Sequence, residues 1–80
     1  MLIEVANDSL NFDRKKKAPL YARAGVSEYW IVNLVDRVIE RRSEPVGAAY
    51  ATLTVFRSGE HIAPLAFPDV TFEVADVFGD

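Results

Sequence analysis

The sequence predicts an α/β (α+β) domain in which a mixed sheet with a β-hairpin packs against one main helix. Three observations support this class. A short apolar run opens the chain, a basic segment with helical spacing follows, and a second strongly apolar run comes soon after a glycine. A strand, a helix and a strand in this order form a βαβ unit, whose strands run parallel with a right-handed crossover.

Residues 1–5 predict the first strand, which we expect to be buried because it is rich in aliphatic residues. Residues 6–11 predict a loop, since Asn, Asp and Ser compete for local hydrogen bonds. Asp13 is the predicted N-cap of a helix that continues to Ala24 and stops at Gly25.

Within this helix, Leu20, Tyr21 and Ala24 are expected to form the apolar stripe. Pro19 lacks a backbone donor and crowds the preceding turn. The sequence therefore predicts a kinked or restarted helix. Either a short first turn ends near Lys17, or the proline lies in the opening turn of the main helix.

The clearest strand covers residues 28–34, which are dense in aromatic and β-branched side chains. A tight turn at 35–37 leads into residues 38–42, where the charged side chains are expected to point outward, and the two strands form a hairpin. For the rest of the chain we expect a turn at 43–47, strands at 50–57, 60–62 and 70–74, an irregular segment at 64–69 and a helical turn at 75–78.

The size of the chain, 80 residues without cysteine, limits its stability. A domain of this size buries only about 60–65% of the surface that its unfolded chain exposes, and disulfides and thiolate zinc sites are excluded. The first strand begins at or before the first residue. We therefore expect residues 1–80 to be a single partial domain without its N-terminal part, and to form a homo-oligomer, most simply a dimer.

Charge is distributed unevenly along the chain. The net charge is −3, but residues 13–23 carry five basic side chains against one acid, whereas residues 59–80 carry five acids and no Lys or Arg. This balance excludes a histone-like protein that binds by charge alone, and it leaves room for a local basic face that contacts nucleic acid. The uncharged stretch 46–56 is too short to span a membrane, and the first residues lack the basic start and apolar run of a signal peptide, so we expect a cytoplasmic protein.

Glu4, Lys17 and Tyr21 are the residues most suggestive of chemistry. A carboxylate on a strand can hold Mg²⁺, which prefers oxygen ligands. A lysine that reaches the same point from a helix can orient a water and stabilise a phosphate oxyanion. Lys17 and Tyr21 are four residues apart and share one helical face. Residue types alone favour a simpler interpretation, in which Glu4 is an acid at a strand end beside a solvated lysine face.

A longer pattern favours the chemical interpretation. Glu4-Val5 is followed by Asp13-Arg14 and Lys17, then by Pro-Leu-Tyr-Ala-Arg-Ala-Gly-Val at 19–26 and Glu-Tyr-Trp-Ile-Val at 28–32. This pattern resembles the Uma2 family of restriction-endonuclease-like proteins, bacterial members of the PD-(D/E)xK nuclease superfamily. The resemblance covers nearly the whole chain and corresponds to the C-terminal half of the family's domain.

The resemblance implies a restriction-endonuclease-like core and cleavage of DNA that depends on Mg²⁺ or Mn²⁺. It assigns Glu4 as the metal-binding acid and the backbone carbonyl of Val5 as a further ligand. The superfamily lysine normally follows the acid by two residues, where this chain has Ala6, so the resemblance assigns that role to Lys17 on the helix. It places Asp13 and Tyr21 around the site or facing DNA, and Arg14, Lys15, Lys16 and Arg23 against phosphates.

One departure from the family's pattern bears on activity. The superfamily's first metal ligand is an aspartate on an earlier strand, which the sequence does not contain. With one carboxylate instead of two, we expect weak or absent nuclease activity, and pairing of two copies could cover the exposed sheet edge. The alternative function is a non-catalytic dimerisation or interaction module that retains the nuclease fold.

Other candidate residues have simpler explanations. Asp69 and Glu73 imitate the paired acids of a nuclease, but their spacing leaves no room for a turn between two strands, so Asp69 is expected in a turn. His61 is expected to be an ordinary strand residue. Tyr29 and Trp30 could stack on a base, but at least one of them is expected in the core.

Overall fold

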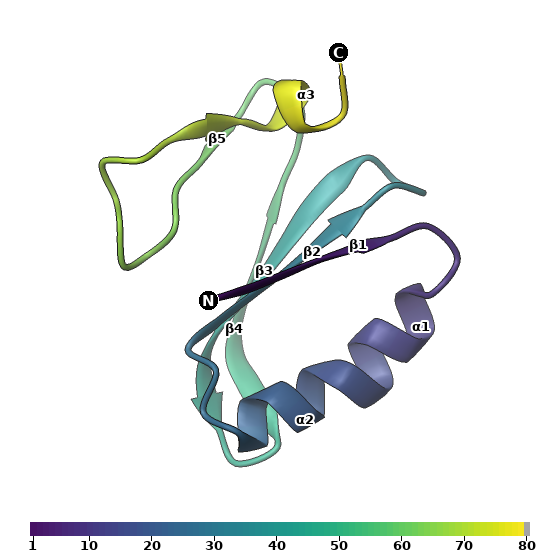
Figure 1. Ribbon diagram of the computed structural model, residues 1–80, viewed down its shortest axis with the longest axis vertical. Helices are drawn as coiled ribbons and strands as arrows, with labels where there is room; N and C mark the ends of the chain where they lie inside the picture. The colour runs from purple at the N-terminus through teal and green to yellow at the C-terminus, as the bar shows by residue number, and fades with distance from the viewer. Residues whose placement is uncertain (80) are drawn as a thin grey trace.

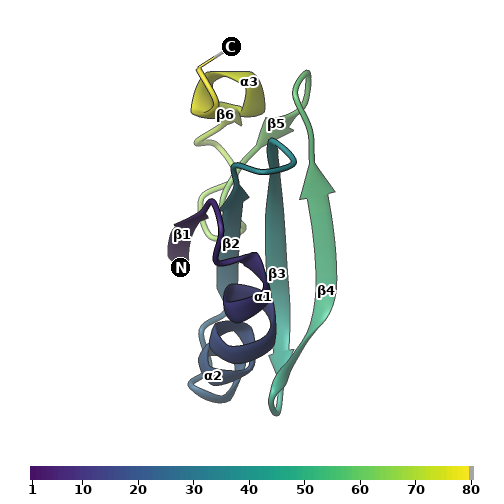
Figure 2. The same ribbon diagram turned by 90° about the vertical axis from the view of Figure 1, so that its right-hand side faces the viewer.

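A four-stranded mixed sheet with one helical segment on one face forms the body of the protein, as Figure 1 and Figure 2 show in two views. The computed structural model describes residues 1–79. The predicted mixed sheet, main helix and hairpin are confirmed. The elements in chain order are β1 (Leu2–Ala6), α1 (Leu10–Phe12), the π-helical turn η1 (Asp13–Lys17), α2 (Ala18–Arg23), β2 (Glu28–Asn33), β3 (Val38–Val46), β4 (Ala49–Phe56), β5 (His61–Ile62), β6 (Phe72–Glu73) and α3 (Val74–Val77).

The sheet has the order β1-β2-β3-β4, with β1 parallel to β2 and the other neighbours antiparallel. The parallel pair confirms the predicted βαβ unit. Every residue of β2 is buried, because its neighbours pair with it on both sides and both faces are covered. β5 and β6 form a separate two-stranded sheet that lies with α3 at the far end of the molecule from α2 (Figure 1).

The expectation of a buried first strand is wrong. β1 lies at an edge of the four-stranded sheet, and only alternate side chains face the helix. Ile3 and Val5 point to the opposite face, where Val5 is 64% exposed. Burial of an aliphatic strand depends on what covers its second face, and that information is absent from the strand's own sequence.

The helix begins earlier than predicted. Ser9 occupies the N-cap position, and Asp13 has helical backbone angles with a buried side chain, so Asp13 is not the N-cap. Leu10, the first residue of α1, packs against the cluster that contains Tyr29 and Ile31, and this contact favours a helix that starts before Asp13. The helical segment then continues without interruption through η1 into α2.

The segment changes from π-helical to α-helical geometry at Ala18, and Pro19 lies in the first turn of α2, which is the second of the two predicted arrangements. The backbone N–H of Ala18 donates to the Asp13 carbonyl, five residues earlier, which makes the preceding turn wider than an α-helical turn. This wider turn accommodates the proline, which has no N–H to donate and whose ring would crowd a normal turn.

The buried face of the helix differs from the predicted apolar stripe. Ala18 and Ala22 are buried and Tyr21 is half-buried, whereas Leu20 is 57% exposed and Ala24 is exposed. The small alanine side chains let the helix approach the sheet closely. The sequence prediction favoured the larger Leu20, but the position of the sheet relative to the helix decided the buried face.

Gly25 ends the helix as predicted. Its N–H donates to the Ala22 carbonyl, and the N–H of Val26 donates to the Tyr21 carbonyl, both at 3.0 Å. This is a Schellman motif, which requires a left-handed residue after the helix, and Gly25 has a φ of 77°.

The second half of the chain largely follows the predicted order. The β2–β3 hairpin, β4, the short β5 and the final helical turn are confirmed. β3, however, continues to Val46 through the predicted turn at 43–47. β2 pairs with β3 only as far as Ser43, so Pro45 pairs with β4 alone. A proline is tolerated in a strand where one side needs no hydrogen bond from it. The predicted strand at 70–74 shortens to β6, since Val74 starts α3 and is fully buried.

Two apolar clusters lie on the two faces of the sheet. On the helix side, Tyr29 and Ile31 pack against the helical segment. On the other side, Trp30 packs with Ile62 and Val74 of the C-terminal elements. Tyr29 and Trp30 are therefore both core residues, which excludes base stacking by either side chain in this conformation.

Candidate active site

Glu4 is the centre of the candidate site. Its side chain projects from β1 toward the helix, where the Lys17 ammonium lies 2.9 Å from Oε2 and the Tyr21 hydroxyl donates to Oε1 at 2.7 Å. Buried Tyr29 on β2 also donates its hydroxyl to Oε2, at 3.3 Å. Three donors, one each from η1, α2 and β2, therefore fix one carboxylate at the interface of helix and sheet.

Asp13 extends this cluster along the helix. Its side chain is almost completely buried, one turn before Lys17, with Oδ1 3.5 Å from the Lys17 ammonium. Oδ2 accepts a hydrogen bond from the Ser9 hydroxyl at 3.1 Å. Oδ1 has no hydrogen-bond partner among the described residues. Two carboxylates, from β1 and from η1, thus share one ammonium group.

The protonation states follow from these contacts. Burial opposes ionisation of Glu4, but the hydrogen bonds from Lys17 and Tyr21 outweigh it and lower the pKa of Glu4. The hydrogen bond to Glu4 raises the pKa of Lys17, and it also raises the pKa of Tyr21. Burial raises the pKa of Tyr29. At neutral pH the site therefore contains a carboxylate, an ammonium and two neutral phenols, so Lys17 is a cation and proton donor rather than a base.

The ring contact between Tyr21 and Tyr29 makes the site more rigid. Their centroids are 5.0 Å apart at an interplanar angle of 76°, the edge-to-face arrangement that aromatic pairs favour. The two hydroxyls that hold Glu4 are thus positioned by each other's rings. A carboxylate held in this way keeps its orientation when a ligand approaches.

A second ion-pair network anchors the same helix further across the sheet. Glu40 on β3, predicted to point outward, is instead buried and binds the Arg14 guanidinium through both oxygens. Arg42 donates to it at 3.0 Å and Asn33 at 3.2 Å. Burial opposes ionisation of Glu40, but these hydrogen bonds lower its pKa.

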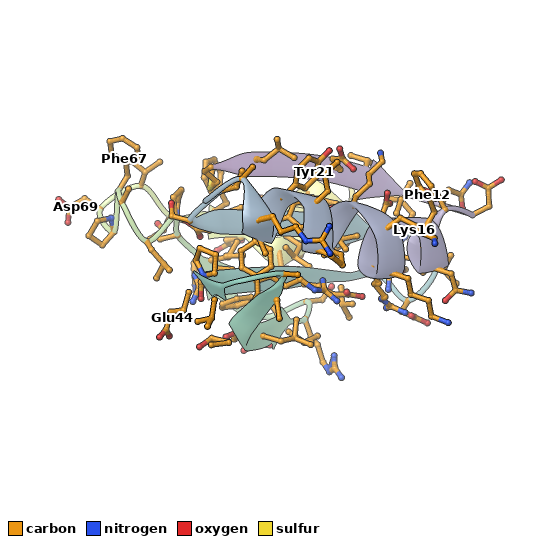
Figure 3. The ribbon with its side chains drawn as sticks, turned by 90° about the horizontal axis from the view of Figure 1, so that it is seen from below. Phe12, Lys16, Tyr21, Glu44, Phe67 and Asp69 are labelled. Carbon is orange, nitrogen blue, oxygen red and sulfur yellow. The ribbon has the colours of Figure 1, made fainter. Side chains whose placement is uncertain are left out.

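The other basic residues of the helix differ from Arg14 in exposure. Lys15, Lys16 and Arg23 are exposed, and Lys16 lies near Phe12 at the N-terminal end of the helical segment in Figure 3. Arg14 is half-buried, and Glu40 compensates its charge. The exposed set offers positive charge to solvent, whereas Lys17 points inward to Glu4.

The remaining candidates lie away from this cluster. Asp69 is in a turn, as expected, in the loop at the end of the molecule opposite Phe12 and Lys16 (Figure 3). Glu73 is exposed on β6 and pairs with His61 at 3.3 Å on the surface. In residues 1–79, no group of three or more His, Cys, Asp or Glu side chains gathers in a way that could hold a metal ion.

Sequence reasoning missed Tyr29 and Ser9 as parts of the site. Tyr29 belongs to an apolar strand, and its approach to Glu4 follows from the β1–β2 register, which pairs Glu4 with Ile31 and so puts Tyr29 on the helix side. Ser9 is four residues before Asp13, a spacing that signals contact only if the helix is known to start before Asp13.

Comparison with known proteins gives one match. The chain matches the family model described as "Uma2: Putative restriction endonuclease" over residues 1–75. No curated protein and no solved structure matches it. None of the helices within residues 1–79 has the length and apolar character needed to cross a membrane. The family match covers most of the chain, so the protein belongs to the Uma2 family.

Proposed function

We propose that this domain takes part in hydrolysis of phosphodiester bonds in DNA, with Mg²⁺ or Mn²⁺ as cofactor, in the bacterial cytoplasm. The observation that carries the proposal is the 2.9 Å contact between the Lys17 ammonium and Glu4 Oε2. A carboxylate on a strand and a lysine on the following helix converge there, as metal-assisted phosphodiester hydrolysis requires.

The donors around Glu4 fit a hard divalent cation. Glu4 supplies a carboxylate, and Val5 supplies a backbone carbonyl. The Ala6 carbonyl accepts from Leu34, which follows β2, and backbone groups alternate along a strand, so the Val5 carbonyl points to the open edge of β1. The buried Oδ1 of Asp13 accepts no hydrogen bond from a described residue and lies 3.5 Å from the Lys17 ammonium, so it adds a further carboxylate oxygen.

Each residue has a defined task in this proposal. A bound Mg²⁺ would supply positive charge to the phosphate and lower the pKa of a bound water. Glu4 holds the cation, and Tyr21 and Tyr29 orient the Glu4 carboxylate through their hydroxyls. Lys17, which stays protonated, stabilises the negative charge that develops on the phosphate oxygens or orients the attacking water.

The exposed basic residues of the helix are the proposed DNA contacts. Lys15, Lys16 and Arg23 present their charge to solvent, and binding of each to a phosphate releases counterions and strengthens association. Arg14 contributes less than these three in our proposal, because Glu40 already binds its guanidinium.

We further propose that residues 1–80 correspond to the C-terminal half of the family's nuclease domain. In the superfamily pattern, one acidic ligand lies on an earlier strand. We therefore expect weak or no cleavage by residues 1–80 alone. A version extended upstream with that strand is expected to cut more efficiently.

The alternative is a non-catalytic module that dimerises through its exposed apolar surface. Ile3 lies on the open face of β1 next to Phe72 and Val77, and these side chains border an apolar cavity of about 180 Å³. Sedimentation of the purified chain distinguishes the two functions when combined with DNA binding. A stable dimer without salt-sensitive DNA affinity supports the module.

Cleavage of supercoiled plasmid with Mg²⁺ or Mn²⁺ tests the proposed function. The comparison includes residues 1–80, an upstream-extended version and Lys17→Ala in the extended version, with Arg57→Ala as a control that removes an exposed basic side chain from β4's end. We expect metal-dependent nicking that Lys17→Ala abolishes and Arg57→Ala retains. The proposal fails if the extended protein does not cut, or cuts equally well without Lys17.

A further inference from the structure

We propose that Asp13 is the second carboxylate ligand of the divalent cation, and that the Lys17 ammonium is an exchangeable group that holds Asp13 and Glu4 together until the cation binds. This inference rests on the proposed function and names the ligands of the same site. It adds Asp13 to Glu4 as an acidic ligand within residues 1–80, beside the acid that the family's pattern places on an earlier strand.

The first evidence is the unsatisfied oxygen of Asp13. The side chain is only 2% exposed, and a buried carboxylate oxygen without a hydrogen bond is costly. Oδ2 is satisfied by Ser9, so the deficiency is confined to Oδ1, the oxygen that faces Lys17. The Lys17 ammonium forms a long ion pair with Oδ1 at 3.5 Å, which satisfies this oxygen only weakly. A ligand that binds Oδ1 directly would remove this cost.

The second evidence is the geometry around the ammonium. Glu4 Oε2 and Asp13 Oδ1 both lie within 3.5 Å of Lys17 Nζ. Mg²⁺ binds oxygen at about 2.1 Å, so two of its ligands are about 3–4 Å apart. The ammonium thus occupies the position between two oxygens that a cation would take.

Lys17 is able to leave without disrupting the core. Its side chain is about one-third exposed, and its ammonium lies 5.7 Å from the centroid of the Phe12 ring at the outer end of the helical segment. The lysine stem is flexible, and its charge remains close to the site after displacement. A phosphate bound by the cation would then be within reach of the released ammonium.

The charges of the cluster support this exchange. Glu4, Asp13 and Lys17 together carry one excess negative charge. Addition of a divalent cation reverses it to one excess positive charge. A phosphodiester carries one negative charge, so the metal-bound cluster would match the substrate, whereas the metal-free cluster would repel it.

Glu40 is the other buried carboxylate on this face of the sheet, and it does not fit the role. Glu4 pairs with Ile31, which pairs with Glu40, so the two acids are separated by two strand spacings, about 10 Å. Glu40 also already accepts hydrogen bonds from Arg14, Arg42 and Asn33. Of the two buried acids described on the helix side, Asp13 shares the Lys17 ammonium with Glu4, whereas Glu40 is bound by Arg14.

Binding of Mn²⁺ in the absence of DNA tests the inference, measured from the electron paramagnetic resonance signal of the free ion. Asp13→Asn is expected to raise the Kd for Mn²⁺ at least about tenfold. Asp69→Asn removes an exposed acid and serves as the matched control, with an unchanged Kd. Lys17→Met is expected to bind Mn²⁺ several-fold more tightly, because it removes the competing ammonium, while Arg57→Met has no effect.

The outcomes separate this inference from the proposed function. An unchanged Kd in Asp13→Asn together with a lost site in Glu4→Gln would overturn the role of Asp13 and leave the metal site at Glu4 standing. Weaker Mn²⁺ binding in Lys17→Met would overturn the exchange. This measurement tests the exchange even if Asp13→Asn fails to fold. Absence of Mn²⁺ binding by the unaltered protein would overturn both the metal dependence and the inference.

Discussion

Replacement of Glu40 by Gln removes one buried negative charge and keeps the shape of the side chain. Glu40 is 3% exposed and accepts hydrogen bonds from Arg14, Arg42 and Asn33. Loss of one partner of a buried ion pair costs about 3–5 kcal/mol. Arg14 keeps contact with water, because its side chain is 37% exposed, and this reduces the expected loss to about 2 kcal/mol.

Thermal and urea unfolding at pH 7 measure this loss. For a domain of this size, a change of about 2 kcal/mol lowers Tm by about 10 °C. Glu44→Gln is the matched control, since Glu44 is exposed on the same strand and its replacement is expected to change stability by less than about 0.5 kcal/mol. A loss for Glu40→Gln no greater than that of the control would refute the structural role of Glu40.

The pH dependence of the same variant provides a second check. The pKa of Glu40 is lower in the folded state than its ordinary value of 4.5. The stability that Glu40 contributes is therefore complete above pH 4.5 and is lost as the pH falls through the lower folded-state pKa. The difference between the unaltered protein and Glu40→Gln should shrink below pH 4.5. A difference that stays constant to strongly acidic pH contradicts the charge argument.

Two further predictions concern the helix. Gly25→Ala should lower the free energy of unfolding, measured in urea, by about 1 kcal/mol. The φ of 77° strains an alanine, although no atom would contact its Cβ. Gly25→Asn should lower it less, because asparagine tolerates positive φ better. Lys15→Gln and Lys16→Gln should each reduce the slope of log K against log salt for duplex DNA by about 0.9 in fluorescence anisotropy, if each contacts one phosphate; unchanged slopes would remove them from the DNA interface.

Elements whose structure depends on residues close in the sequence were predictable from the sequence. The βαβ order, the β2–β3 hairpin and the stop at Gly25 follow from local patterns of apolar residues and from glycine's access to positive φ. The exposed face of β1 and the continuation of β3 through Pro45 were not predictable in this way. Both depend on which strands and helices lie alongside, which is decided by tertiary packing.

The candidate site shows the same division. The convergence of Glu4 and Lys17 was anticipated from the family's pattern, which places both residues on adjacent elements. The buried position of Asp13 and the contribution of Tyr29 required the register of β1 against β2 and the true start of the helix. Glu40 was expected to face solvent because charged residues usually do. Hydrogen bonds from two arginines offset the free energy that its burial costs.

In our proposal the two ion-pair networks have different roles: the Arg14–Glu40 network holds the helix on the sheet, and the Lys17 network binds a ligand. Lys17 and Arg14 are three residues apart on the helix and bind acids that lie on either side of buried Ile31 in the sheet. If Lys17 alone anchored the helix, its displacement by a cation would loosen the site as the cation bound. The saturated contact between Arg14 and Glu40 keeps the helix docked, so Lys17 can exchange partners while Tyr21 remains in place on Glu4. In our proposal, the stable Arg14–Glu40 contact is therefore what allows Lys17 to exchange partners at the Glu4 site.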